Sequence, residues 1–139
     1  MTWNVELTKA QQNLIRFTDR TPATEMILYD ELVKTGKEQI ASDDFRFTLK
    51  RKISGMYDPL YNKEWYPAII GSTINNLVSK GVMIRSPFIE GHYSLTKNAQ
   101  KHMEHYFDKD LMKQIVEVGN LFDNQHETCL LYTSPSPRD

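Results

Sequence analysis

The sequence predicts a mainly α-helical protein with one small β-hairpin. Three observations support this prediction: apolar residues recur at helical spacing along most of the chain, two short runs of β-type residues flank a turn, and the length of 139 residues suits one domain, or two at most. Apolar residues make up 40% of the chain, and no uncharged apolar run approaches the roughly 20 residues of a membrane span. We therefore expect a folded protein with a buried core and no membrane partner.

Two helices are predicted in the N-terminal part of the chain. Thr8 and Gln11 have the spacing of a capping box, which predicts a helix from Thr8 to about Arg20. Pro22 suits the first helical position of a second helix, and Gly36 is expected to end it. The apolar face of this second helix is predicted to consist of Met26, Ile27, Leu32 and Val33.

A third helix is predicted from Ser42, a good N-cap residue, to Gly55, which we expect to be its stop. Two acidic residues follow Ser42 and three consecutive basic residues lie near the end, and this charge distribution suits the helix dipole. Three apolar residues repeat every fourth position, so we expect them to face the core: Phe45, Leu49 and Ile53.

A loop and a fourth helix follow. Residues 56–64 are rich in Tyr, Asp, Pro and Asn, which predicts a loop. The helix is predicted from Trp65 to Lys80, with Gly81 as its C-terminal signal. Its apolar positions are Tyr66, Ile69, Ile70, Thr73, Ile74, Leu77 and Val78. Its opposite face, which we expect to be exposed, is polar and consists of Ser72, Asn75, Asn76 and Ser79.

The C-terminal part predicts a hairpin and further helices. Residues 82–84 and 92–95 are strand-like runs, and the turn between them contains Pro87 and Gly91. We expect Thr96 to cap the next helix. A further apolar spacing that begins at Leu111 predicts a C-terminal helix.

Two segments carry a family resemblance. Residues 77–83 (LVSKGVM) and 92–96 (HYSLT) resemble the hallmark of the winged helix-turn-helix superfamily. In regulators of the MarR and PadR type, and in the N-terminal module of Mrr-like restriction enzymes, a recognition helix ends with L-x-x-x-G-L-I and is followed by a wing and by Y-x-L-T-x-x-G. Ala99 stands here in the place of the last glycine of that motif.

The resemblance implies a division of the chain. It covers residues 21–107, which we expect to form a winged-helix domain. Residues 1–20 are then an N-terminal helical extension, and residues 108–128 begin a C-terminal helix.

Charge is unevenly distributed along the sequence. The net charge is −3 over residues 1–45, +6 over residues 46–101 and −4 over residues 102–128, within a total of −1. A nucleic acid responds to the local field and not to the total charge, so the middle segment is the candidate surface. The alternative is that these charges only solvate helix faces.

The resemblance implies that the helix 65–80 enters the major groove of double-stranded DNA. An Asn side chain in that groove can pair with adenine through two hydrogen bonds. We expect base contacts from Ser72, Asn75, Asn76 and Ser79. We expect phosphate contacts from Lys50, Arg51, Lys52, Lys63 and Lys80, with Arg85 as a cation of the wing. The alternative is that these polar side chains merely face water.

Other kinds of site have weaker support. His102 and His105 lie three residues apart on a predicted helix, but the spacing of a metalloprotease helix is absent. The sequence contains no phosphate-binding loop, dinucleotide-binding motif or nucleophile elbow. We therefore expect no intrinsic enzyme activity, no cofactor and no bound metal.

Two functions remain open. The first is DNA binding, most simply as a cytoplasmic transcriptional regulator whose C-terminal helix pairs two protomers into a homodimer. The second is a winged helix that binds other proteins or serves as the N-terminal targeting module of a longer enzyme. The acidic flanks and the poorly charged wing favour the second, and the basic middle segment favours the first.

The C-terminal segment has a different character from the rest. Residues 129–139 (CLLYTSPSPRD) resemble the translation of a transposase adapter used to prepare sequencing libraries. An ordinary Ser- and Pro-rich tail is the alternative. We expect this segment, which holds the only cysteine, to be an artefact and the natural protein to continue past about Thr128.

Overall fold

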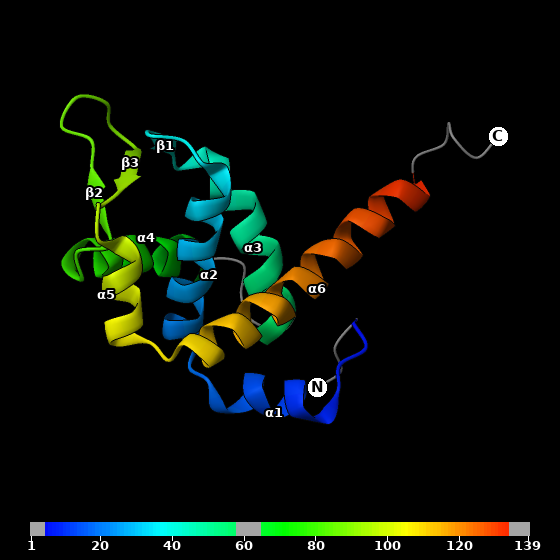
Figure 1. Ribbon diagram of the computed structural model, residues 1–139. Helices are drawn as coiled ribbons and strands as arrows, with labels where there is room; N and C mark the ends of the chain where they lie inside the picture. Colours follow the sequence, from blue (N-terminus) through cyan, green and yellow to red (C-terminus); the bar gives the residue numbers. More distant parts are fainter. Residues whose placement is uncertain (1–4, 58–64, 134–139) are drawn as a thin grey trace.

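The computed structural model describes the backbone of residues 5–57 and 65–133, and the side chains of residues 5–56 and 69–124. The chain is mainly helical and carries a small antiparallel sheet, as the sequence predicts (Figure 1). The helices are α1 (Lys9–Phe17), α2 (Arg20–Thr35), α3 (Asp43–Tyr57), α4 (Trp65–Ser79), α5 (Ala99–Tyr106) and α6 (Lys109–Thr133). The strands are β1 (Ile40–Ala41), β2 (Met83–Arg85) and β3 (His92–Leu95).

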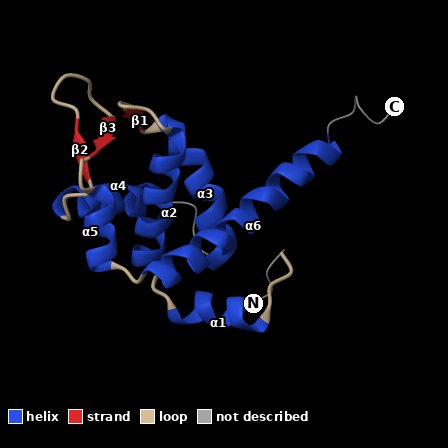
Figure 2. Ribbon diagram, viewed as in Figure 1, coloured by secondary structure: helices blue, strands red, loops and turns tan. Residues whose placement is uncertain are grey.

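The sheet contains one strand more than the predicted hairpin (Figure 2). β2 and β3 form that hairpin, with Met83 opposite Leu95. β1 pairs with the other edge of β3, where Ile40 lies opposite Tyr93, so the strand order is β1-β3-β2. A strand of two residues is too short to show an alternating pattern, which explains why the sequence did not predict β1.

The core is built around α2, which lies between α3, α4 and α6 (Figure 1). Met26, Ile27 and Leu32 are buried as predicted, but Val33 is 49% exposed. All three apolar residues predicted to anchor α3 are fully buried, namely Phe45, Leu49 and Ile53. The helix faces that enclose α2 therefore follow the apolar spacing of the sequence.

The helix ends in the N-terminal part confirm two predicted caps. The amide of Gln11 donates to Thr8 Oγ1 at 3.1 Å, and the amide of Thr8 donates to Gln11 Oε1 at 3.0 Å, which completes the capping box. α1 ends at Phe17, short of Arg20. α2 begins at Arg20, so Pro22 is its third residue and not its first, contrary to the prediction. Gly36 ends α2 in the left-handed conformation with φ 62°, where a side chain would be strained.

Gly55 does not end α3, contrary to the prediction. The helix continues to Tyr57, and Gly55 lies where α6 packs closely against α3. A Cβ atom at Gly55 would lie 2.5 Å from Cδ1 of Phe122. The glycine is therefore explained by helix packing rather than by chain reversal.

Thr96 does not cap a helix either. α5 begins at Ala99, with Asn98 as its N-cap residue. The Thr96 hydroxyl instead donates to the carbonyl oxygen of Gly81, and the Thr96 amide donates to the carbonyl oxygen of Val82 at 2.9 Å. These bonds tie the end of β3 to the segment that links α4 with β2.

α6 uses its apolar face within the same protomer. Ile115, Val118 and Phe122 are buried, and the helix packs against α1, α2 and α3. These residues of α6 are therefore already covered within the protomer as far as Phe122. The helix runs unbroken through the predicted boundary at residues 128 and 129 to Thr133, and its C-terminal part projects from the body (Figure 1). Among the described residues, no helix combines the length and apolar character required to cross a membrane.

Candidate nucleic-acid interface

The polar face of α4 is exposed because the opposite face is anchored in the core. Ile70, Ile74 and Leu77 are buried, as is Thr73, whose hydroxyl donates to the backbone oxygen of Ile69 at 2.6 Å. Three residues of the predicted polar face are exposed, namely Ser72, Asn75 and Ser79. The fourth, Asn76, is half-buried. We call Ser72, Asn75 and Ser79 the exposed face of α4. It offers hydroxyl and amide groups to solvent along one side of the helix.

The hairpin contributes a cation to this face. Arg85, the last residue of β2, is exposed, and its Nη2 donates a hydrogen bond to Oδ1 of Asn75. The guanidinium group therefore lies against the middle of the exposed face of α4. Asn75 and Arg85 are thus in direct contact, although ten residues separate them in the sequence.

Lys80, a predicted phosphate contact, forms an ion pair within the fold. Its ammonium group pairs with the carboxylate of Glu25, which is only 2% exposed. The same nitrogen lies 5.4 Å from the ring centre of Tyr106 and 5.1 Å from that of Phe107. Lys80 thus fixes the end of α4 to α2 and α5, with cation–π contacts supporting the ion pair.

Lys52 is also withdrawn from the predicted surface. Only 1% of the residue is exposed, and its ammonium group pairs with Glu31 of α2. Lys34 extends this cluster: its Nζ lies 3.0 Å from Asp30 and 3.8 Å from Glu31. Partial burial alone would lower the pKa of Lys34, but the hydrogen bond to Asp30 and the nearby carboxylates outweigh it and raise that pKa.

The remaining predicted phosphate contacts differ from one another. Nε of Arg51 lies 2.7 Å from Oδ1 of Asp123, so Arg51 joins α3 to α6. Lys50 is exposed on α3. Lys63 lies outside the described residues.

These ion pairs explain the uneven charge of the sequence. Three cations of the basic middle segment, Lys80, Lys52 and Arg51, pair with carboxylates from the acidic flanks, Glu25, Glu31 and Asp123 respectively. Much of the charge that suggested a phosphate-binding surface is therefore neutralised inside the fold. The sequence alone showed which segments were oppositely charged but not that they meet.

The tip of the hairpin is apolar, a feature that the sequence analysis did not single out. Phe88 is 91% exposed, and Ile84 and Ile89 are about half exposed. The amides of Phe88 and Ile89 donate to Oγ of Ser86 at 3.2 and 3.1 Å, so the tip forms a defined turn. The Pro-Phe-Ile sequence in a polar turn region was the available signal.

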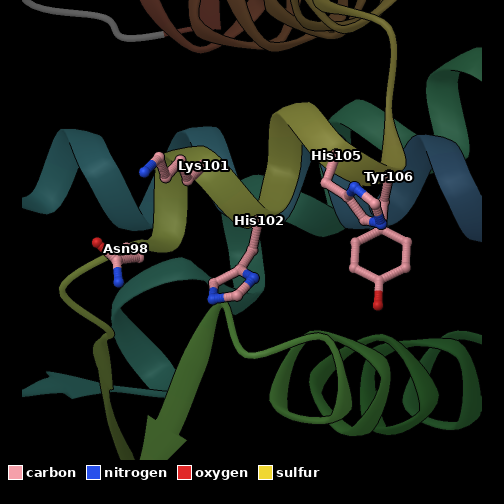
Figure 3. Close-up of a pocket in the computed structure, with 5 residues that line it drawn as sticks. All are labelled: Asn98, Lys101, His102, His105 and Tyr106. Atoms are coloured by element: carbon pink, nitrogen blue, oxygen red, sulfur yellow. The ribbon is translucent and has the colours of Figure 1, made fainter.

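The two histidines of α5 border an open hollow of about 500 Å³ (Figure 3). Its lining residues are Asn98, Lys101, His102, His105 and Tyr106. Among the described residues, no three His, Cys, Asp or Glu side chains are grouped so that they could hold a metal ion.

Comparisons with models of protein families, with curated proteins and with solved structures each find no match to this chain.

Proposed function

We propose that this protein is a winged-helix DNA-binding protein that places α4 in the major groove. The order of elements supports this proposal: α2, β1, α3, α4 and the β2–β3 hairpin follow one another as helix, strand, helix, helix and wing. The observation that carries the proposal is the exposed face of α4 with Arg85 of the hairpin held against it. Transcriptional regulation is the simplest use of such a domain.

The proposed contacts divide into two groups. The exposed face of α4 and Arg85 supply hydrogen-bond donors and acceptors for base edges. Lys50 on α3 supplies a positive charge for the phosphate backbone. Because three of the other predicted cations are paired internally, we expect binding to depend more on base contacts than on phosphate contacts.

The proposal is tested with a negative charge on the exposed face of α4. Ser72→Glu places a carboxylate where the groove carries acceptors and phosphates, and we expect it to weaken duplex binding at least tenfold. Gln114→Glu on the exposed side of α6 is the matched control, because it adds the same charge away from α4. Fluorescence anisotropy with a labelled duplex at two salt concentrations measures both variants.

Two results would contradict the proposal. One is an absence of duplex binding by the parent protein at low salt. The other is an equal effect of Ser72→Glu and Gln114→Glu, which would place the interface away from α4.

Protein binding through the hairpin is the second candidate function. The exposed apolar residues of the hairpin favour it, because such residues are typical of interaction sites: Phe88 and Ile89 at the tip, and Ile84 in β2. Glu90 beside the tip would also repel phosphates. If Phe88→Ser removes partner binding in a pull-down and leaves duplex binding unchanged, the hairpin binds proteins and α4 binds DNA.

A further inference from the structure

We propose that Asn75 and Arg85 form a single reading unit that selects guanine, although an Asn in this position is expected to select adenine. The inference rests on the proposed DNA binding and deepens it by naming the base. Its basis is the hydrogen bond from Arg85 Nη2 to Asn75 Oδ1, between two exposed side chains of α4 and β2.

The partner fixes the orientation of the Asn75 amide. A guanidinium group carries only N–H donors, so the atom of Asn75 that faces Arg85 has to be the oxygen. The usual ambiguity between the oxygen and nitrogen of an amide therefore does not arise here. The Asn75 NH₂ group is consequently directed away from Arg85, with both of its donors available.

The Asn75–Arg85 unit therefore offers hydrogen-bond donors to a base, whereas its acceptor, Oδ1 of Asn75, already accepts from Arg85. Asn75 presents Nδ2–H groups, and Arg85 presents the N–H groups that do not contact Asn75. Oδ1 of Asn75 already accepts a charge-assisted hydrogen bond, which is stronger than one between neutral groups. The oxygen keeps a second lone pair, but a base amino group that donated to it would lie close to the guanidinium donors.

Guanine is the base that matches such a unit in the major groove. Its N7 and O6 atoms are both acceptors, whereas adenine presents one acceptor and one donor, and cytosine presents a donor. Pairing with adenine would require Oδ1 of Asn75 to accept from the adenine amino group, which would also face the guanidinium donors. The contact between α4 and the hairpin thus changes the expected base at this position from adenine to guanine.

The test is a selection from randomised duplexes with four proteins. The parent should enrich a guanine whose replacement by 7-deazaguanine, which lacks the N7 acceptor, lowers affinity about fivefold or more. Arg85→Ala frees Oδ1 of Asn75, so we expect adenine to replace guanine at that position. Asn75→Asp keeps an acceptor for Arg85 and removes the amide donors, so we expect a weaker preference for guanine. Arg16→Ala on α1 is the control that removes one arginine charge far from α4, and it should return the parent motif.

The outcomes separate this inference from the proposed function. A gain of adenine preference in Arg85→Ala cannot result from unfolding, because an unfolded protein selects nothing. If the parent and Arg85→Ala select the same base at every position, the guanine inference is overturned and DNA binding stands. If the parent selects adenine at the position sensitive to Asn75→Asp, the inference is likewise overturned. If none of the four proteins enriches any duplex, both the inference and the proposed function are overturned.

Discussion

At the scale of single residues, two lysines of the basic segment form ion pairs within the fold. Lys80 and Lys52 stand in a basic segment of the sequence, yet each neutralises a carboxylate of α2. The ammonium of Lys80 is the charge that compensates Glu25, which is almost fully buried. Removing one partner of such a pair costs more than the pair contributes, because a charge is left buried without compensation.

We therefore predict that Lys80→Ala destabilises the protein by about 3–5 kcal/mol. The double variant Glu25→Gln and Lys80→Met removes both charges and should recover much of this loss. Urea unfolding at pH 7 measures the free energies. Lys113→Ala is the control at an exposed lysine and should change stability by only about 0.5 kcal/mol. A loss below about 1 kcal/mol for Lys80→Ala would show that the buried carboxylate of Glu25 does not need the charge of Lys80.

At the scale of elements, Gly55 allows α3 and α6 to pack closely, although the sequence predicted that it would end α3. Phe122 of α6 occupies the space beside Gly55, and Ile115 and Val118 bury the same helix in the core. Arg51 and Asp123 add an ion pair between these two helices. α6 is thereby an integral part of the domain over its described side chains, where the sequence suggested a separate pairing helix.

Gly55→Ala should therefore destabilise the protein by about 1–3 kcal/mol, because the new methyl group would overlap the ring of Phe122. The matched control is Gly71→Ala on α4, where a Cβ atom meets nothing within 4 Å. That change should stabilise by about 0.5–1 kcal/mol, because alanine favours a helix over glycine. Thermal unfolding of both variants measures the difference. Equal shifts in the melting temperature would contradict the packing explanation.

At the scale of the whole molecule, ion pairs join segments of opposite charge. The acidic segments contribute α2 and α6, and the basic segment contributes α3 and α4. Other cations of the basic segment are exposed, among them Lys50 on α3 and Arg85 against the exposed face of α4. Because three cations of the basic segment are already paired, we expect the proposed DNA binding to have a weak electrostatic component.

The dependence of duplex binding on salt tests this picture. If about two to four phosphates are neutralised, the logarithm of the association constant should fall against the logarithm of the salt concentration with a slope of about −2 to −4. Lys50→Ala should make the slope shallower by about 1, whereas Lys113→Ala on the exposed side of α6 should leave it unchanged. A slope of about −6 or steeper would contradict the expected weak electrostatic component.

The sequence by itself determined the helices, the hairpin and the exposed side of α4. These features depend on local patterns: apolar spacing, the capping box at Thr8, Gly36 and the two β-type runs are all visible within a few residues. The exposure of Ser72, Asn75 and Ser79 followed because the opposite side of the same helix is apolar.

Only the tertiary structure decided which partners the polar and small residues meet. β1 pairs with β3, and Gly55 packs against Phe122. Lys80 forms an ion pair with Glu25, and Asn75 accepts a hydrogen bond from Arg85. In three of these four contacts the partners lie more than 50 residues apart in the chain, and in the fourth they belong to two different elements. No local pattern records such a partner, because short-range spacing fixes the face of an element but not the element that packs against it. The charge of the middle segment was therefore visible in the sequence, whereas its neutralisation inside the fold was not.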